Sequence, residues 1–538
     1  MVINYLINSA KRNTSVSNDD LEVVSFLEGN RHIVKVKAKT DLTLGDAEDY
    51  LPLQVNDQDL YFLNGYQSWT DTKEYRLNAK FKNIQKFPKL INKKFALEKY
   101  GDVTFYQYSK NKLHGYDVFY SKGQAESFLY SLNFRTAYLI VELLKKEREH
   151  IHLISDVKNI ALKKGEEVTV FDYKFFNSYK EGLEAFNQDF PLINKEKIFG
   201  YTSWYNYYQN INEEIILRDL EALDDRFNVF QIDDGYETFV GDWLDVDPNK
   251  FPNGLGDIVK KVHAKGYKAG IWLAPFGVET KSKTFQEHKD WLVHDKDGNP
   301  LIVGGNWSGF YTLDIYNKDA REYIRKCLTY FMDLGFDFFK LDFLYASALY
   351  PVEGKSRCQV QREAYQFLRE VLKDRIILGC GANIVNCYEA FDYLRIGPDV
   401  SLIFDDVWIM KLLHRERIST KITLQNTIFR SVLNQRWFGN DPDVFLLRDD
   451  NIKLSKEQRE ALTKINALFG SVLMTSDNIA AYDDEKKKVL SEALELFRNA
   501  KVLNVLTNGE CIEVKYSLNS AEHQFKYNTK KGVFEHYE

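Results

Sequence analysis

The stretch Asp337-Phe338-Phe339-Lys340-Leu341-Asp342-Phe343-Leu344-Tyr345 has the composition of a short, buried strand that carries two opposite charges. Side chains of a strand alternate between its two faces, so Lys340 and Asp342 point to the same face. A charged pair on the inward face of an apolar strand is costly unless its members are paired or used. Lys340 is expected to favour the ionised form of Asp342, which is the form that a nucleophile requires. Taken alone, the pair fits a structural ion pair in a sheet as well as it fits a catalytic site.

Strand and helix patterns alternate on both sides of this stretch. The amphipathic segment from Asn317 to Leu334 predicts a helix that leads into it, and residues 359–373 predict the helix that follows. Further strands are predicted at residues 199–204, 229–234, 268–273, 375–380, 393–399, 443–446 and 471–474. Eight alternating units, counted with the opening stretch, favour a (β/α)8 barrel over an open sheet. No glycine-rich dinucleotide or phosphate loop follows these strands, which disfavours a nucleotide-binding fold.

The regions that flank this alternating pattern read differently. Residues 1–190 contain short runs of alternating apolar and polar residues separated by turn signals, which predict an antiparallel β-sandwich. Similar runs return in residues 501–538 and predict a small C-terminal β domain. The sequence therefore predicts a multidomain α/β protein with a central, catalytic (β/α)8 TIM barrel over residues 196–500.

Composition excludes several classes of protein. The chain has 538 residues, 44% apolar and 28% charged, and its net charge of −6 with no long basic run disfavours nucleic acid as a partner. No run of 18 apolar residues predicts a membrane span, and the charged pair Lys11-Arg12 comes too early for a secretory signal. Five scattered cysteines are typical of reduced thiols, so we expect a cytoplasmic protein.

A metal site is not expected. His150 and His152 lie on one face of a predicted strand, but no third ligand is near them in the sequence. The predicted barrel strands end without the histidine pair that metal-dependent hydrolases generally need.

Residues that suit carbohydrate chemistry gather where the predicted barrel strands end. Chemistry in such barrels is concentrated at these ends. Carboxylates accept hydrogen bonds from sugar hydroxyls, and indole faces cover the apolar C–H side of a sugar ring. Each aspartate alone is more simply explained as a helix N-cap, but their gathering at one rim favours a site for a polyhydroxylated ring. The residues at this rim are Trp204, Asp233, Asp234, Trp272, Lys340, Asp342, Cys380, Arg395 and Asp399.

Two of these carboxylates suit a retaining glycosidase, which needs a nucleophile and an acid/base roughly 5–5.5 Å apart. Asp342 and Asp399 follow predicted strands four and six, a separation that can place them across a sugar ring. Asp399 follows Gly397-Pro398, where burial would raise its pKa and suit it to act as the acid. Asp233 and Asp234 are adjacent, and both can reach one ligand where the backbone turns at the strand end.

Several segments resemble the signatures of glycoside hydrolase family 36, most closely the shorter bacterial α-galactosidases. The resemblance extends from the Asn64–Trp69 loop to beyond residue 480. It implies an N-terminal β-sandwich, a (β/α)8 barrel and a small C-terminal β domain. It also implies retaining hydrolysis of terminal α-galactosides with no metal or organic cofactor. The matching segments are, in order, Phe230–Tyr236, Gly241–Trp243, Gly270–Phe276, Phe339–Leu344, Gly379–Gly381 and Arg395–Asp399.

The resemblance assigns the two reacting carboxylates and the groups that hold sugar hydroxyls. Asp342 falls on the nucleophile position of the family and Asp399 on its acid/base position. Asp233 and Asp234 match the pair that binds the axial and primary hydroxyls of galactose. Lys340 matches a hydroxyl-binding lysine.

The same resemblance assigns the walls of the site. Cys380 and Arg395 match the side that faces the 2-hydroxyl. Trp204 and Trp272 match aromatic walls, and Trp69 matches a residue that reaches in from the sandwich domain.

Two departures from the family pattern bear on substituent preference. Ala382-Asn383-Ile384 follows Gly381, and an extra aromatic residue, Tyr66, precedes Trp69. Both are expected near the 2- and 6-substituents of the substrate.

The sequence thus predicts a cytoplasmic exo-acting α-galactosidase that uses double displacement on α-galactoside oligosaccharides or glycoconjugates. The alternatives are an α-N-acetylgalactosaminidase, a galactosyl transferase of the raffinose-synthase kind, and a catalytically silent sugar-binding module. Self-association is open, since the sandwich and the C-terminal β domain could serve it or simply brace the barrel.

Overall fold

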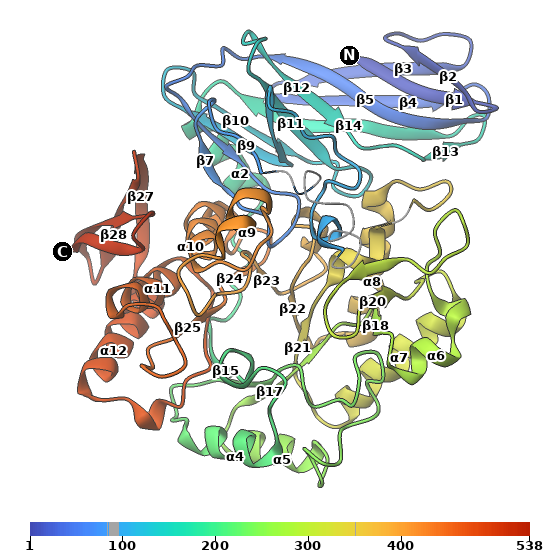
Figure 1. The fold of residues 1–538 in the computed structure, drawn as a ribbon. Coiled ribbons are helices and arrows are strands. Elements are labelled where there is room, and N and C mark those ends of the chain that lie inside the picture. The colour runs from blue at the N-terminus through green and yellow to red at the C-terminus, as the bar shows by residue number, and fades with distance from the viewer. Residues whose placement is uncertain (83, 85–95, 350, 538) are drawn as a thin grey trace.

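The structure is a computed structural model that describes residues 1–82, 84, 96–349 and 351–537. Two antiparallel sheets lie at the N-terminal end, a curled parallel sheet lies below them, and a small antiparallel sheet lies beside the last helices (Figure 1). The chain is therefore a multidomain α/β protein. No helix of the described residues is long and apolar enough to cross a membrane.

The first antiparallel sheet has the strand order β2-β1-β5-β12-β11-β8, with β13 paired to β5. The second has the order β3-β4-β14-β10-β9-β6-β7. Apolar side chains from both sheets, such as Leu44 and Val34, form one buried cluster, as alternation along the strands predicts. The first sheet consists of β1 (Val2–Ile7), β2 (Ala10–Thr14), β5 (Leu42–Pro52), β8 (Lys112–Tyr116), β11 (Leu139–Leu144), β12 (His150–Ser155) and β13 (Ala161–Leu162). The second consists of β3 (Leu21–Glu28), β4 (Arg31–Ala38), β6 (Leu60–Leu63), β7 (Lys73–Tyr75), β9 (Val118–Lys122), β10 (Ser127–Ser131) and β14 (Glu167–Phe176).

The parallel sheet has the order β24-β23-β22-β21-β17-β16-β15-β26-β25. Its end strands, β24 and β25, are separated along the chain by Pro442 and Asp443 alone. The strand predicted at residues 443–446 is found as the two-residue β25, and the short strand β24 before Pro442 was not predicted. Pro442 separates the two because it cannot donate to a strand ladder. The strands are β15 (Ile198–Thr202), β16 (Val229–Ile232), β17 (Lys268–Leu273), β21 (Phe338–Leu341), β22 (Ile376–Gly379), β23 (Tyr393–Arg395), β24 (Gly439–Asp441), β25 (Val444–Phe445) and β26 (Val472–Thr475).

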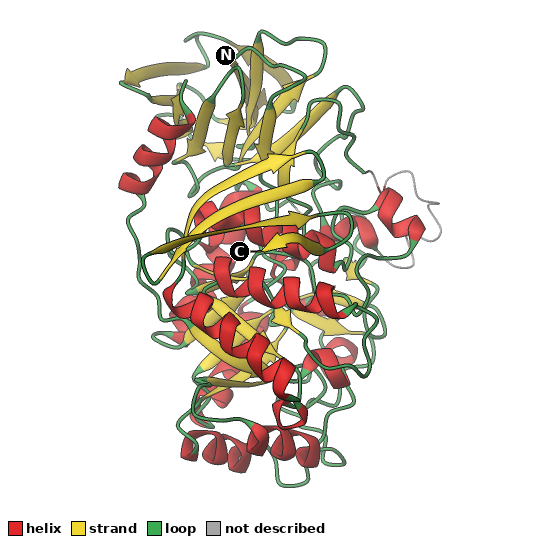
Figure 2. Ribbon diagram, turned by 90° about the vertical axis from the view of Figure 1, so that its left-hand side faces the viewer, coloured by secondary structure: helices red, strands yellow, loops and turns green. Residues whose placement is uncertain are grey.

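Helices cover the outside of this sheet, as Figure 2 shows in red. The predicted helix before β21 is confirmed as α7 (Lys318–Asp333), which is capped by the Asn317 side chain. The next is α8 (Arg357–Leu372), which begins with a capping box of Ser356 and Gln359. The other helices are α2 (Tyr179–Asp189), α3 (Trp204–Tyr207), α4 (Glu213–Ala222), α5 (Gly256–Ala264), α6 (Lys283–Glu287), α9 (Trp408–Leu413), α10 (Thr420–Phe429), α11 (Lys456–Phe469) and α12 (Asp484–Asn499).

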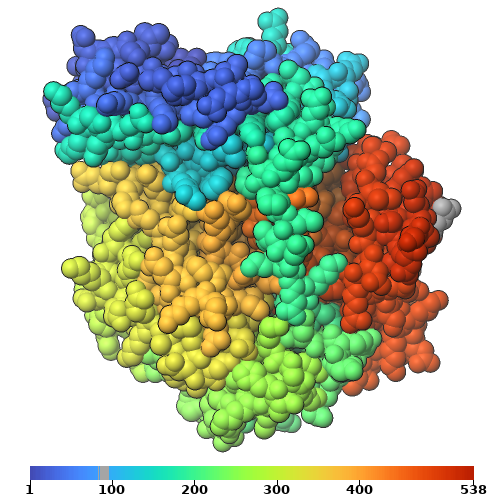
Figure 3. Space-filling model, turned by 180° about the vertical axis from the view of Figure 1, so that it is seen from behind, coloured from blue at the N-terminus to red at the C-terminus, as the bar shows by residue number. Residues whose placement is uncertain are grey.

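Two small sheets complete the fold. One lies after β17 and has the order β18-β20-β19, with strands Gly277–Glu279, Phe310–Thr312 and Ile302–Gly304. The other is a C-terminal meander of β27 (Lys501–Asn508), β28 (Cys511–Leu518), β29 (Ala521–Asn528) and β30 (Val533–Tyr537). Seen from behind in Figure 3, the blue N-terminal part rests on the yellow and orange surface, and the red C-terminal part lies at one side.

One loop joins the N-terminal sheets to the parallel sheet. Residues 64–72 enter between them, and the fully buried Arg430 donates to the backbone oxygens of Ser68 at 2.6 Å and Gln67 at 3.0 Å. The same guanidinium donates to the Asn64 side chain at 3.0 Å and to the Ile396 backbone oxygen at 2.6 Å. A single cation thus ties the loop to the end of β23.

Candidate active site

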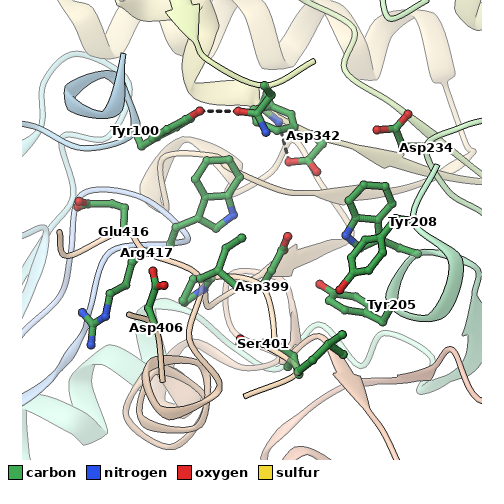
Figure 4. Close-up of a pocket in the computed structure, with 18 of the residues that line it drawn as sticks. Tyr100, Tyr205, Tyr208, Asp234, Asp342, Asp399, Ser401, Asp406, Glu416 and Arg417 are labelled. Atoms are coloured by element: carbon green, nitrogen blue, oxygen red, sulfur yellow. Dashed lines mark hydrogen bonds between the residues drawn. The ribbon is translucent and has the colours of Figure 1, made fainter. Parts of the chain in front are cut away.

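A cavity of about 730 Å³ opens at the carboxyl ends of the parallel strands (Figure 4). Eight predicted site residues line it: Trp69, Trp204, Asp233, Asp234, Trp272, Lys340, Asp342 and Asp399. Cys380 and Arg395 do not line it, although both are buried nearby. The structure therefore gathers residues from five strand ends and from the 64–72 loop into one hollow.

Asp342 lies just beyond the end of β21, which stops at Leu341. The indole Nε1 of Trp272 donates to Asp342 Oδ2 at 3.1 Å, and the backbone N–H of Phe343 donates to Oδ1 at 2.7 Å. Phe343 adopts a left-handed conformation, with φ of 52°, where the chain leaves the strand. Two N–H donors on one carboxylate stabilise its negative charge.

Lys340 pairs with Asp233, with its Nζ donating to Asp233 Oδ2 at 2.8 Å. Burial by itself would lower the pKa of Lys340, but the Asp233 carboxylate and, more weakly, that of Asp342 raise it overall. The lysine is therefore a fixed cation between two site carboxylates. Its direct partner is Asp233, which the spacing along the opening stretch did not indicate.

Asp399 belongs to the loop after β23 and not to the strand predicted through residue 399. Its side chain is 32% exposed and projects toward the cavity (Figure 4). Burial raises the pKa of Asp399, and the Arg395 guanidinium, which donates to Oδ1 at 3.0 Å, opposes this increase. The direction of the shift agrees with the prediction for an acid/base carboxyl.

Arg395 lies behind Asp399 at the centre of a buried acidic cluster. Besides Asp399, its guanidinium contacts Asp441 at 2.9 Å and Asp443 at 2.8 Å. The Tyr205 hydroxyl donates to Asp443, which also accepts the backbone N–H of Val400 at 2.7 Å. The Arg395 guanidinium therefore pairs with three carboxylates, and it affects the cavity through its contact with Asp399.

Cys380 also lies behind the cavity wall, at 1% exposure. Burial, reinforced by the negative charge of Asp342, raises the pKa of this thiol well above its ordinary value. Cys380 is therefore a neutral thiol, which packs as a small apolar group.

Asp233 and Asp234 follow the end of β16 at Ile232, where the backbone turns through Gly235 with φ of 117°. The turn brings both carboxylates to the cavity, as predicted. Asp233 accepts the Gln231 amide at 2.6 Å in addition to Lys340. Asp234 accepts Trp307 Nε1 at 3.0 Å, so each aspartate is held by its own donors.

The tryptophans reach the cavity from three different settings. Trp272 is the fifth residue of β17, whereas Trp204 starts the short helix α3 and is not part of the strand predicted through residue 204. Trp69 comes from the 64–72 loop and packs edge-on against Phe343 and Tyr345, with ring centroids 5.4 and 5.7 Å apart. Its Nε1 is buried and lacks a hydrogen-bond partner among the described residues.

The two departures from the family pattern hold this loop in place and do not line the cavity. The Asn383 side chain donates to the Tyr66 backbone oxygen at 2.7 Å, and the Ser68 N–H donates to Ala382 at 2.9 Å. The Tyr66 ring packs against Tyr116 and other aromatic residues of the N-terminal sheets. Neither Tyr66 nor residues 382–384 line the cavity, and their effect on the sugar substituents stays a prediction.

The cavity-lining residues that belong to loops were not among the predicted site residues. The Tyr100 hydroxyl donates to Asn306 Oδ1 at 2.5 Å across the wall of the cavity (Figure 4). Aromatic residues in turn-prone segments were the one available signal, as in Gly304-Gly305-Asn306-Trp307. The missed lining residues include Tyr100, Tyr205, Tyr208, Gln209, Asn306, Trp307, Asp406, His414, Glu416 and Arg417.

In the described part of the chain, no group of three His, Cys, Asp or Glu side chains is placed to hold a metal ion. His152 instead contacts Glu142 at 2.9 Å and Glu48 at 3.1 Å, and His150 contacts Glu147 at 3.7 Å.

The fold and the cavity define an α/β protein with a carboxylate-rich, aromatic-walled site at the ends of parallel strands. The family model "Melibiase" matches residues 192–372. Alpha-galactosidase 1 of Pediococcus pentosaceus is 28% identical over 211 residues, which are 34% of this chain and 27% of that protein. The matched part of the chain thus spans about a quarter of the length of the curated relatives: 27% of Alpha-galactosidase 1 and 23% of Alpha-galactosidase Mel36A of Lactobacillus acidophilus.

Solved structures resemble the chain over a larger part of its length. The α-galactosidase TtGalA of Thermus thermophilus, solved with p-nitrophenyl α-D-galactopyranoside, has a TM-score of 0.71 at 24% identity. The likeness covers 93% of this chain and 98% of that one. The GH36 α-galactosidase AgaA of Geobacillus stearothermophilus has a TM-score of 0.63 at 12% identity, over 94% of this chain and 72% of that one. The predicted resemblance is confirmed at the level of similarity: residues 192–372 match the melibiase family model, and the curated relatives named first are α-galactosidases. The solved structures share the fold.

Proposed function

We propose that this protein is a retaining exo-glycosidase that hydrolyses terminal α-linked galactose from oligosaccharides or glycoconjugates. The observation that carries the proposal is the contrast between two carboxyl groups on one cavity. Asp342 accepts two N–H donors, whereas burial raises the pKa of Asp399. Carboxyl groups in such contrasting environments suit a nucleophile and an acid/base.

The reaction proceeds in two displacements. Asp342 attacks the anomeric carbon while the protonated Asp399 gives its proton to the leaving oxygen, so the glycosidic bond breaks as the galactosyl–Asp342 ester forms. Asp399, now ionised, takes a proton from water as that water attacks the anomeric carbon, so the bond between this carbon and the Asp342 carboxylate breaks. Galactose leaves, Asp342 is again a carboxylate, and Asp399 is again protonated.

The remaining lining residues bind the sugar. Asp233, Asp234 and Lys340 hold ring hydroxyls through hydrogen bonds, which is consistent with their places on the cavity. Trp69, Trp204 and Trp272 provide flat apolar faces. Arg395 and Cys380 lie behind the cavity wall and influence the site through Asp399 and through packing. The resemblance instead implied that both face the 2-hydroxyl.

The wider organisation is part of the same proposal. We infer that the curled sheet is a closed (β/α)8 barrel over residues 196–500, with β24 and β25 as two halves of one strand. Residues 1–190 form the N-terminal β-sandwich domain and residues 501–538 the small C-terminal β domain. A cytoplasmic location would match the use of short, imported α-galactosides.

The test is turnover of 4-nitrophenyl α-galactoside by the wild type and by Asp342→Ala, with azide as an external nucleophile. We expect an active wild type, a nearly inactive variant, and rescue by azide that yields the β-galactosyl azide. An active variant, or rescue that yields the α-azide, would contradict the assigned nucleophile and the retaining mechanism.

A second substrate separates the alternatives. The corresponding 2-acetamido glycoside is expected to turn over poorly. A wild type that prefers it would be an α-N-acetylgalactosaminidase, and one that transfers galactose to added sugar faster than to water would be a transferase. A wild type that cleaves neither glycoside would refute the proposed function.

A further inference from the structure

Glu237 is a buried carboxyl group that the proposed reaction does not use. It lies three residues beyond Asp234, just past the turn at Gly235, and its side chain is 5% exposed. It does not line the cavity. Its carboxyl group is hydrogen-bonded to that of Asp234, so two acidic side chains meet directly behind the substrate cavity.

Two carboxylates in contact inside a protein repel each other unless a cation or a proton lies between them. Among the ion pairs of the described residues, none joins Asp234 or Glu237 to a lysine or arginine. The nearby Lys340 is paired with Asp233 at 2.8 Å. Lys250 donates to the backbone oxygen of Gly235 at 2.9 Å and not to either carboxyl. With no cation between them, a shared proton removes the repulsion that neutral donors only reduce.

The donors around each carboxyl indicate which of them carries that proton. Asp234 accepts the Gln209 amide at 3.1 Å and the Trp307 indole N–H at 3.0 Å. Glu237 accepts the Gly235 backbone N–H on Oε2 at a longer 3.3 Å. Burial raises the pKa of both carboxyls, but these donors oppose the increase at Asp234, so Glu237 is the better place for the proton.

We propose that Glu237 is a positioning residue: as a neutral acid it donates a hydrogen bond to Asp234 and holds that carboxylate ready for a substrate hydroxyl. The inference rests on the proposed function, because it assumes that Asp234 binds the sugar. Burial, followed by the negative charge of Asp234, raises the pKa of Glu237 well above its ordinary value. The charged and titratable groups next to the pair are Asp233, Tyr236 and Lys250, and Lys340 lies beyond Asp233.

Substrate binding should then depend on pH through Glu237. While Glu237 is protonated, Asp234 keeps its third donor. When the pH rises through the raised pKa of Glu237, the donated bond is lost and two anions repel each other, so KM increases. The binding-competent form is therefore lost as the pH rises through the raised pKa of Glu237.

Two variants test the donated bond. Glu237→Gln keeps a donor and an acceptor in the same places but cannot titrate, whereas Glu237→Leu keeps the volume without a donor. We expect KM of Glu237→Leu for 4-nitrophenyl α-galactoside to exceed that of Glu237→Gln by roughly tenfold at neutral pH. The alkaline rise in KM of the wild type should disappear in Glu237→Gln. Equal KM values for the two variants, or a persistent rise in Glu237→Gln, would overturn the proposal.

A matched control is Glu142→Gln, which neutralises a buried glutamate at 2% exposure in the N-terminal sheets. Glu142 contacts Lys112 and His152 and lies away from the cavity, so its loss should lower stability without changing the pH dependence of KM. A KM profile altered as in Glu237→Gln would assign the effect to stability and overturn the proposal.

A second measurement does not need a substrate. A carboxyl whose pKa is raised by folding stabilises the protein at low pH and loses that contribution as the pH rises through the folded pKa. The urea midpoint of the wild type, compared with that of Glu237→Gln, should therefore fall steadily above pH ~4.3, the ordinary glutamate pKa. A constant difference would mean that Glu237 is ionised and would refute the inference. A falling difference with no α-galactoside turnover would refute the proposed function alone.

Discussion

Replacement of Arg395 by glutamine tests the electrostatics of Asp399, the proposed acid/base carboxyl, most directly. The guanidinium contacts Asp399, Asp441 and Asp443 at 3.0, 2.9 and 2.8 Å. Burial raises the pKa of Asp399, and Arg395 is the largest influence that lowers it. Since an adjacent opposite charge lowers a carboxyl pKa by about 1–3 units, its loss should raise the Asp399 pKa by a similar amount.

The sign of the effect on rate follows from the protonation state that is needed. In the proposed reaction the first displacement requires protonated Asp399, and this form persists to higher pH when its pKa is higher. The alkaline limb of kcat/KM should therefore move upward by about 1–3 pH units. The variant should also lose about 3–5 kcal/mol of stability, because Asp441 and Asp443 are left buried without their cation.

The assay is the pH profile of kcat/KM with an unactivated α-galactoside, so that proton donation limits the rate, together with urea denaturation. Arg369→Gln is the control: Arg369 pairs with Asp392 at 2.6 Å and does not line the cavity. It should lower stability and leave the alkaline limb unchanged. An unchanged or lowered alkaline limb in Arg395→Gln would refute the assignment of Asp399 as an acid controlled by Arg395.

Two further predictions concern other contacts of the site. Trp272→Phe keeps an aromatic wall but removes the indole donor to Asp342. Because a hydrogen bond to a charged group contributes about 1.5–3 kcal/mol, we expect kcat in steady-state turnover to fall roughly tenfold or more. A kcat equal to that of the wild type would mean that the donor is irrelevant to the nucleophile. Arg430→Met removes the cation that binds the backbone oxygens of Ser68 and Gln67. The Trp69 indole should then be more accessible, so acrylamide should quench the tryptophan fluorescence more strongly, and the urea midpoint should fall. Unchanged quenching would show that the loop is held without Arg430.

Local patterns predicted the repeating elements well. The helix from Asn317 to Leu334 is found with these two residues as its caps, because an amphipathic period and an N-cap side chain are both local properties. The strand ends that carry Asp233 and Asp342 were also predicted. The alternation of two residues in a strand and the period of 3.6 residues in a helix depend only on residues close in sequence, so a short segment is enough to predict these elements.

The partners of the site residues could not be predicted from local patterns. Strand spacing placed Lys340 beside Asp342, but the direct ion pair is with Asp233, which lies 107 residues earlier. Tyr100 reaches Asn306 across 206 residues, and neither lies in a segment with a regular period. These contacts depend on how strands and loops meet in space, and no single segment carries that information.

The hydrogen bonds between Arg430 and the 64–72 loop have a consequence for when the cavity is completed during synthesis. The guanidinium and the Ser68 oxygen that it binds are 362 residues apart, so during synthesis the loop leaves the ribosome long before its partner exists. Until then the Ser68 oxygen lacks this partner, and the loop has only earlier contacts such as the Asn383 side chain on the Tyr66 oxygen and the packing of Trp69 against Phe343. A nascent chain that already contains Asp342 and Asp399 therefore still lacks the cation that ties this wall of the cavity to the end of β23, and the wall is complete only after residue 430 has been made.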